Sequence, residues 1–280
     1  MAKICYISDF FLNGPGPSGG AELSDDVLIR FLEDRGHQVS KEMSSRFSFS
    51  RYNEDFFFVV SNFATLSQEA RDCFSSNFSS KYIIIERDQK YVRTRNTANY
   101  PDYIAPKSEV VNQEFYANAK KVFCLTSKQM EIMSAHINLD NLESLGCTQF
   151  SADQIKVLRA NLNNKQYDSV YAIVPGKRSQ VAQAYCENEG IDYRILRKSN
   201  YSSFIKELSK YEGLAFFSHA FESCCRLLVE ARVLGLKIVT DDKNGCTYED
   251  WFREYSGEEL LDFIESKTMQ TMQRIEEEIV

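Results

Sequence analysis

The stretch of sequence that decides the fold runs from Phe221 to Ala231 and reads FESCCRLLVEA. The apolar run at 213–217 before it is typical of a buried strand. Residues 227–234 have the spacing of a helix, and Gly235 follows as a stop signal. The sequence therefore predicts a strand, a loop and a helix, with Glu222 in the loop where open α/β sheets bind ligands.

Two carboxylates in this stretch, Glu222 and Glu230, are eight positions apart, and Arg226 lies between them. A carboxylate near a strand end can bind paired hydroxyls, such as those of a ribose. An arginine and the amides at a helix start can bind phosphate. Together these groups indicate a nucleotide, and favour one that activates another group.

The pattern of short strands and helices occurs twice along the 280 residues, which give room for two domains of about 140 residues each. We therefore expect two doubly wound, Rossmann-like parallel-sheet domains that face a central cleft. The expected domains are 1–150, on the acceptor side, and 151–256, which binds the nucleotide. A last helix at 257–280 is expected to cross back to the first domain.

Charge and cysteine content narrow the class of protein. The net charge is −7, which argues against non-specific binding of nucleic acid but leaves room for a local basic cleft. The eight cysteines form no CxxC pair, and with three histidines they give no zinc spacing, so we expect reduced thiols and no metal site. No signal peptide or membrane span is recognisable, and we expect a cytoplasmic protein.

Three further loops follow predicted strands. The glycine-rich loop 14–22 contains Gly19, Gly20 and Glu22, and suits either a phosphate contact or a plain tight turn. Lys177 and Arg178 open a helix after a strand, where a cation can neutralise a diphosphate or simply be a surface charge.

The third loop, residues 86–106, mixes charged residues with tyrosines and is too polar for a core. Such a mixture can line a groove for sugar or nucleic acid, and it can equally be a solvated loop with salt bridges. Its candidate binding residues, on the acceptor side, are Glu86, Asp88, Arg93 and Arg95.

Residues 213–245 resemble the nucleotide-binding core of GT-B glycosyltransferases, in particular glycosyltransferase family 4. Gly19-Gly20-Ala21-Glu22 looks like the family's first-domain glycine loop, and Lys177 looks like the lysine of its phosphate loop. The stretch from Glu86 to Cys124 is similar to small members encoded by bacteriophages. The matching positions of the core are Glu222, Cys224-Cys225, Glu230-Ala231, Gly235 and Ile238-Val239.

This resemblance implies a retaining, metal-independent hexosyl- or pentosyltransferase that needs no cofactor beyond its donor, with a UDP-sugar favoured. Glu230 would hold the ribose, and Glu222 would contact the transferred sugar. Lys177, with Arg178 or Arg226, would neutralise the leaving diphosphate. The loop at Gly19 and Gly20 would add backbone amides there, and Cys224 and Cys225 would lie beside the nucleotide. We expect these thiols to be packing groups rather than reactive ones.

The acceptor stays open: a sugar, a glycoconjugate or modified DNA. One alternative is a phage enzyme that glycosylates a hydroxymethylated pyrimidine base of DNA in the host cytoplasm. Another is a catalytically silent protein that binds a nucleotide sugar. The oligomeric state is not predicted.

Overall fold

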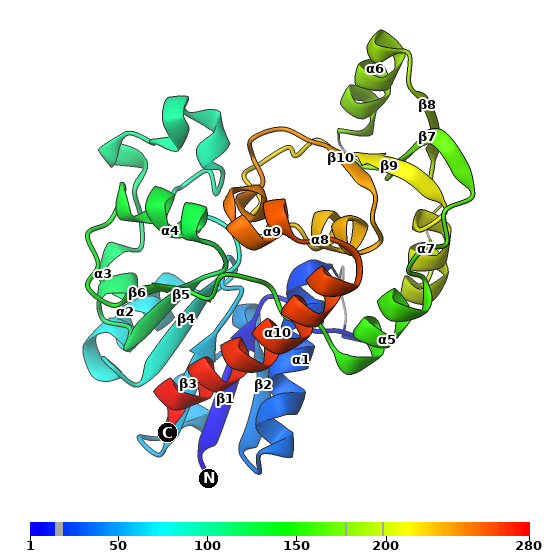
Figure 1. Ribbon diagram of the computed structural model, residues 1–280. Coiled ribbons are helices and arrows are strands. Elements are labelled where there is room, and N and C mark those ends of the chain that lie inside the picture. Colours follow the sequence, from blue (N-terminus) through cyan, green and yellow to red (C-terminus); the bar gives the residue numbers. More distant parts are fainter. Residues whose placement is uncertain (15–18, 177, 198) are drawn as a thin grey trace. The chain divides into compact units, whose positions relative to one another are not determined.

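The computed structural model describes residues 1–14, 19–176, 178–197 and 199–280 (Figure 1). Lys177 and positions 15–18 of the glycine loop, both singled out above, lie outside these residues. The chain divides into two compact units. Unit 1 contains Met1–Gln149 and Thr268–Val280, and unit 2 contains Phe150–Lys267.

Unit 1 contains a six-stranded sheet in which every neighbouring pair is parallel. The spatial order is β2-β1-β3-β4-β5-β6, so the strand order reverses beside β1. Chain segments that follow β1, β3 and β4 therefore meet at one edge of the sheet, the usual place for a ligand in such folds. The strands are β1 (Lys3–Ser8), β2 (Gln38–Met43), β3 (Phe56–Val60), β4 (Tyr82–Glu86), β5 (Lys121–Cys124) and β6 (Leu142–Ser144).

Aromatic side chains fill much of the core between the sheet and the helices of unit 1. Phe74 lies at the centre of this cluster, with its ring centroid 5.1 Å from that of Phe58 and 5.0 Å from that of Tyr82. All three side chains are completely buried. The helices are α1 (Gly20–Asp34), α2 (Gln68–Asn77), α3 (Gln113–Ala117) and α4 (Ser127–Ser134).

Two local predictions in unit 1 were wrong. The sequence of residues 108–119 predicts a helix with Ser108 as its N-cap, but the α-helix of this region, α3, begins only at Gln113, because Asn112 has a left-handed φ of 60°. The stretch 86–106 was expected to be too polar for a core, yet Tyr91 and Val92 are completely buried and Lys90 is only 2% exposed. Burial of the Lys90 cation is tolerated because Glu86 and Asp88 pair with it.

Unit 2 contains a four-stranded parallel sheet in the order β10-β9-β7-β8. The expectation of two doubly wound parallel sheets is therefore confirmed. The strands of unit 2 are β7 (Tyr167–Ile173), β8 (Asp192–Ile195), β9 (Tyr211–Ala215) and β10 (Lys237–Val239). Its helices are α5 (Ala152–Ala160), α6 (Ser179–Glu189), α7 (Tyr201–Leu208), α8 (Arg226–Val233) and α9 (Asp250–Glu254).

Two glycines shape the segment that positions the candidate site. At Gly213 in β9, a Cβ atom would lie 2.2 Å from the ring of Tyr171 on the neighbouring strand β7, so any larger residue would force that ring to move. Gly235 has a φ of +78°, the left-handed conformation that ends a helix, and it follows α8.

The last helix, α10 (Gly257–Ile279), contributes residues to both units. Its first half binds Arg159 through Asp262 at 2.9 Å and Glu265 at 3.0 Å. In its second half, Arg274 donates two hydrogen bonds of 2.9 Å to the carboxylate of Glu143 on β6. Within the described ranges, α10 and the other helices all lack the combination of length and apolar composition that crossing a membrane requires.

Candidate functional site

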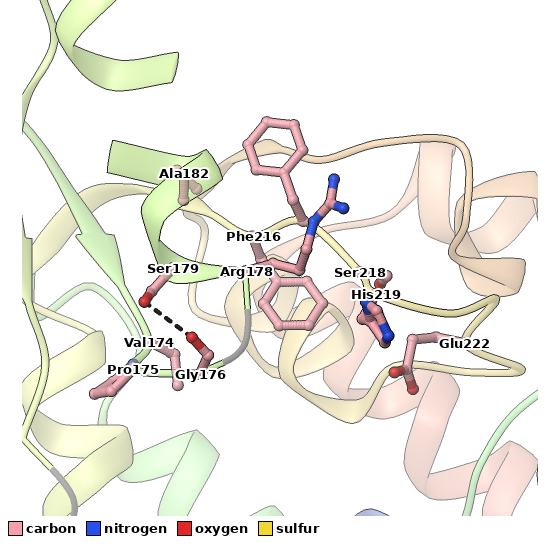
Figure 2. A pocket seen from close by; sticks show the side chains of 12 residues that line it. Val174, Pro175, Gly176, Arg178, Ser179, Ala182, Phe216, Ser218, His219 and Glu222 are labelled. Carbon is pink, nitrogen blue, oxygen red and sulfur yellow. Dashed lines mark hydrogen bonds between the residues drawn. The ribbon is translucent and has the colours of Figure 1, made fainter. Parts of the chain in front are cut away.

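A pocket of about 210 Å³ lies in unit 2 at the carboxyl ends of β7 and β9 (Figure 2). One wall is formed by residues 174–176 after β7 and by the start of α6, and the other by residues 216–219 and Glu222 after β9. These are the segments in which the sequence predicted ligand contacts. The parallel order of the sheet brings them together because both strands end at the same edge.

The start of α6 forms the first wall. Ser179 Oγ donates a hydrogen bond of 3.0 Å to the carbonyl of Gly176, as Figure 2 shows, and this closes the turn into the helix. The amides of Ser179 and Val181 already donate to the carbonyls of Gly176 and Arg178. Among the described residues of this wall, Arg178 is the one with a cationic side chain.

Arg178 lines the pocket, yet its Nε atom is buried without a hydrogen-bond partner. Among the described residues, no carboxylate forms an ion pair with its guanidinium. A guanidinium that folding leaves uncompensated at a pocket wall is suited to an anionic ligand, above all to phosphate, whose oxygens match its fork of donors.

Glu222 and His219 are on the opposite side of the pocket from Pro175 and Gly176 (Figure 2). The backbone of Glu222 is held from both directions, because its amide donates to the carbonyl of Lys243 at 2.7 Å and its carbonyl accepts from Gly245 at 2.8 Å. The side chain is exposed. The carboxylate is thus presented to solvent from a fixed backbone position and can accept hydrogen bonds from hydroxyl groups.

Glu230 and Arg226 do not line this pocket, and α8 directs both into the interior of unit 2. The guanidinium of Arg226 lies 4.0 Å from the ring centroid of Phe150 and donates a hydrogen bond of 2.9 Å to Gln154 Oε1. Its Nε atom is 3.8 Å from Glu230 Oε1. Burial raises the pKa of Glu230 to about 6, while Arg226 and the hydroxyl of Tyr201 oppose the shift.

Cys224 and Cys225 are buried at the start of α8. Burial, and then the charge of Glu222, raise the pKa of the Cys225 thiol well above its ordinary value. A thiol with a raised pKa is a poor nucleophile at neutral pH. This setting fits the packing role expected for these two residues.

The described end of the glycine loop, from Gly19 to Glu22, caps the first helix of unit 1. Gly19 is the N-cap of α1, and its amide donates a hydrogen bond of 2.6 Å to the carboxylate of Glu22. The Glu22 side chain therefore reaches back to cap the helix that begins at Gly20. Only 7% of Glu22 is exposed, so its carboxylate is occupied by this contact.

The candidates Glu86, Asp88 and Arg95, at the end of β4 and after it, form a paired network with Lys90, another basic residue of the same stretch. Lys90 Nζ lies 2.9 Å from Glu86 and 2.8 Å from Asp88, and Arg95 lies 2.6 Å from Asp88. Burial raises the pKa of Glu86 in spite of Lys90. Arg93 stands apart from this network, at 3.8 Å from Glu109.

A second network, which the sequence analysis missed, lies at the carboxyl edge of the same sheet. Asp25 on α1 accepts hydrogen bonds from Tyr6 at 2.9 Å, Ser8 at 3.1 Å and Ser61 at 2.7 Å, and forms an ion pair of 2.6 Å with Arg87. The signal in the sequence was a carboxylate in the apolar stripe of a helix. No cluster of three His, Cys, Asp or Glu side chains suited to a metal occurs in the part of the chain that the structure describes.

No protein-family model and no curated protein sequence matches this chain. Solved structures do match it. The catalytic domain of starch synthase IV from Arabidopsis thaliana, bound to ADP and acarbose, matches with a TM-score of 0.59 and 10% identity, covering 99% of this chain and 98% of that one. The chain has the GT-B fold.

Two other glycosyltransferases match this GT-B chain at similar levels. One takes part in avilamycin A biosynthesis, with a TM-score of 0.50 and 11% identity over 99% of this chain and 97% of that one. The other is an alpha-glucosyltransferase in complex with UDP and a 13-mer DNA that contains a central A:G mismatch. Its TM-score is 0.51 and its identity 10%, over 98% of this chain and 90% of that one.

Proposed function

We propose that the chain is a glycosyltransferase that takes its sugar from a nucleotide-diphosphate donor bound in unit 2. The observation that carries this proposal is the pocket beyond β7 and β9, where Arg178 has no acidic partner among the described residues and Glu222 is held on the facing wall. Two solved structures with the same fold, the starch synthase domain and the alpha-glucosyltransferase, contain ADP and UDP.

The proposed reaction breaks the bond between the anomeric carbon of the sugar and the terminal phosphate oxygen of the donor. An acceptor hydroxyl forms the new bond to that carbon and releases its proton to water, while the leaving diphosphate takes the electron pair of the broken bond and gains negative charge. Arg178 stabilises this charge, helped by the neighbouring Lys177. A fixed cation is effective here because it needs little reorganisation as the charge develops.

Glu222 is the proposed contact for hydroxyls of the transferred sugar. Glu230 is the proposed ribose ligand, a role that requires the ribose to reach a carboxylate in a residue only 5% exposed. Arg226 acts in this proposal through Glu230, because their side chains are 3.8 Å apart and both are buried. Gly20 is proposed to offer a backbone amide near the phosphates, since the amide of Gly19 is bonded to Glu22.

The finer features are proposals that rest on the family resemblance. They are family 4 and phage-type membership, UDP as the nucleotide, retention of the anomeric configuration and independence from metal. Proton NMR of the product tests the configuration, since an inverted anomer would exclude the retaining reaction. Turnover that persists in excess EDTA supports metal independence, and its loss would contradict it.

The central experiment is a thermal-shift panel of UDP-, GDP-, ADP- and dTDP-sugars, followed by donor hydrolysis and transfer assays. A bound donor stabilises the folded protein by mass action and so raises the melting temperature. At a donor concentration of one hundred times the Kd, the free energy of unfolding rises by about 2.7 kcal/mol. Lys177→Ala should lower turnover strongly without unfolding the protein, whereas Lys206→Ala, on an exposed face of α7, should not. The absence of any donor shift would overturn the proposal.

The purified protein can also be tested for two alternative functions. A DNA glycosyltransferase would bind duplex DNA at low salt in a mobility-shift assay, and the absence of binding would exclude it. Arg95 and Lys90 in the stretch proposed for acceptor contact are already paired with acids, which weakens a DNA groove. A silent nucleotide-sugar binder would show donor shifts with no hydrolysis or transfer for any donor and acceptor.

A further inference from the structure

A second pocket, of about 290 Å³, lies within unit 1 at the carboxyl edge of its sheet. Its walls come from residues 63 and 64 after β3, from 90–95 after β4, from the start of α2 and from residues 111 and 112. None of the described residues that line it is acidic. Four are cationic: Arg71, Lys90, Arg93 and Arg95.

Three of these four cations are balanced by acids behind the pocket wall. Lys90 lies within 2.9 Å of both Glu86 and Asp88, and Arg95 lies 2.6 Å from Asp88. Arg93 is only loosely balanced, because its Nε is 3.8 Å from Glu109 and its side chain is 65% exposed.

Arg71 on α2 is the exception. Its guanidinium donates to the carbonyl of Leu66 and to Gln68 Oε1, which fixes its position, and its Nε is buried without a hydrogen-bond partner. Among the described residues it forms no ion pair with a carboxylate. Burial lowers the pKa of Arg71 below its ordinary value, and the nearby charge of Asp72 opposes this shift only in part.

We propose that this pocket binds a phosphate monoester carried by the acceptor, with Arg71 and Arg93 as the phosphate ligands. The identification of the ligand as an acceptor rests on the proposed glycosyl transfer, whereas the anion site itself does not. Phe63, Val92 and Val111 give the pocket an apolar side for the carbon skeleton of the ligand.

The volume of the pocket and the net charge of the protein favour a small molecule over a nucleic acid as the ligand. Pockets for small ligands begin at about 300 Å³, so the cavity matches one compact group. A polyanion needs several phosphate contacts along a basic surface, whereas this chain has a net charge of −7.

The test is calorimetric binding of glucose 6-phosphate, with glucose as the neutral match, to a protein that carries Arg178→Gln. This background removes Arg178, the cation among the described lining residues of the unit 2 pocket, so phosphate binding there is weakened. We expect glucose 6-phosphate to bind and glucose not to bind. Adding Arg71→Gln or Arg93→Gln should each weaken binding about tenfold, the effect of one charge-assisted hydrogen bond.

Arg30→Gln is the matched control, because Arg30 is a surface residue of α1 paired with Asp26 and should leave the affinity unchanged. Should Arg71→Gln fail to fold, Arg93→Gln decides alone, since its side chain is mostly exposed. Equal binding of glucose, or affinity unchanged by Arg93→Gln, would overturn the proposal. Competition by duplex DNA would overturn it in favour of a nucleic-acid site. Binding of glucose 6-phosphate by a protein that turns over no donor would support the anion site and contradict only the proposed transferase function.

Discussion

The two units share a parallel-sheet plan, but the buried ion pair at the sheet edge of unit 1 differs from the cation that lines the pocket at the sheet edge of unit 2. In unit 1, Arg87 and Asp25 are 2.6 Å apart, and their side chains are 4% and 1% exposed. In unit 2, Arg178 lines a pocket and no described acid pairs with it. A buried ion pair contributes to stability, because removing one partner leaves the other as a buried, unpaired charge. A cation at a pocket wall that forms no ion pair can instead bind an anionic ligand.

The largest expected effect is on the stability of unit 1, where Arg87 and Asp25 form a buried ion pair. Arg87→Met should destabilise the protein by about 3–5 kcal/mol, because Asp25 is left as a buried charge without its cation. Urea unfolding measures this by circular dichroism, which follows both units. The single tryptophan, Trp251, is in unit 2, so its fluorescence shows whether unit 2 unfolds with unit 1. A loss of stability below about 1 kcal/mol, no greater than that of the surface control Arg30→Met, would show that the buried pair does not stabilise unit 1.

The second prediction concerns the unpaired cation. Arg178→Gln should lower kcat/KM for the donor about 100-fold, because it removes a fixed charge from the leaving diphosphate. Its free energy of unfolding should change by no more than about 0.5 kcal/mol, since no partner is stranded. Steady-state kinetics and urea unfolding measure the two effects, with Arg253→Gln, an exposed arginine in the same unit, as control. A large stability loss with normal kinetics would reverse the assignment.

A third prediction uses the pH dependence of stability. The pKa of Glu230 is about 6 in the folded protein against an ordinary 4.5, so folding favours the protonated form. Stability from this group is fully present below pH 4.5 and is lost as pH rises through 6, by about 2 kcal/mol. Glu230→Gln does not titrate, and should therefore gain about that much relative to the natural chain between pH 4.5 and 7.5. Trp251 fluorescence in urea measures this, and a difference independent of pH would contradict it.

The smallest expected effect tests the exposed margin of the paired network. Arg95→Gln should cost less than about 1 kcal/mol, because its side chain is 47% exposed and Asp88 keeps Lys90 as a partner. Urea unfolding of this variant beside Arg87→Met separates surface pairing from buried pairing. Equal losses in the two variants would show that burial is not what distinguishes them.

Much of the fold could be predicted because its signals are local. The apolar run at 213–217, the helical spacing at 227–234 and the stop at Gly235 lie within one segment and need no distant partner. The helix expected from Ser108 failed because a left-handed Asn112 interrupts it, and no strong local signal marks that turn. The stretch 86–106 was misjudged because its polar residues become buried only when their partners surround them.

The candidate site was predictable in its place but not in the orientation of its side chains. Glu222 and Arg178 both follow predicted strands, and both line the pocket. Glu230 and Arg226 were expected beside them, but their side chains point into the interior of unit 2, where Phe150 and Gln154 contact the guanidinium. The contact between Arg226 and Gln154 joins residues 72 positions apart, which is beyond any helical or strand period.

The sequence by itself determined two parallel α/β sheets and the residue types at their carboxyl edges, because the period of apolar residues and the residues after each strand are local properties. Only the tertiary structure decided which charges are paired. Arg87 and Asp25, which are 62 positions apart, meet at 2.6 Å, while no described carboxylate forms an ion pair with Arg178 or Arg71. The physical reason is that the strength of a charge interaction depends on distance and desolvation, and both are set by how separate elements pack.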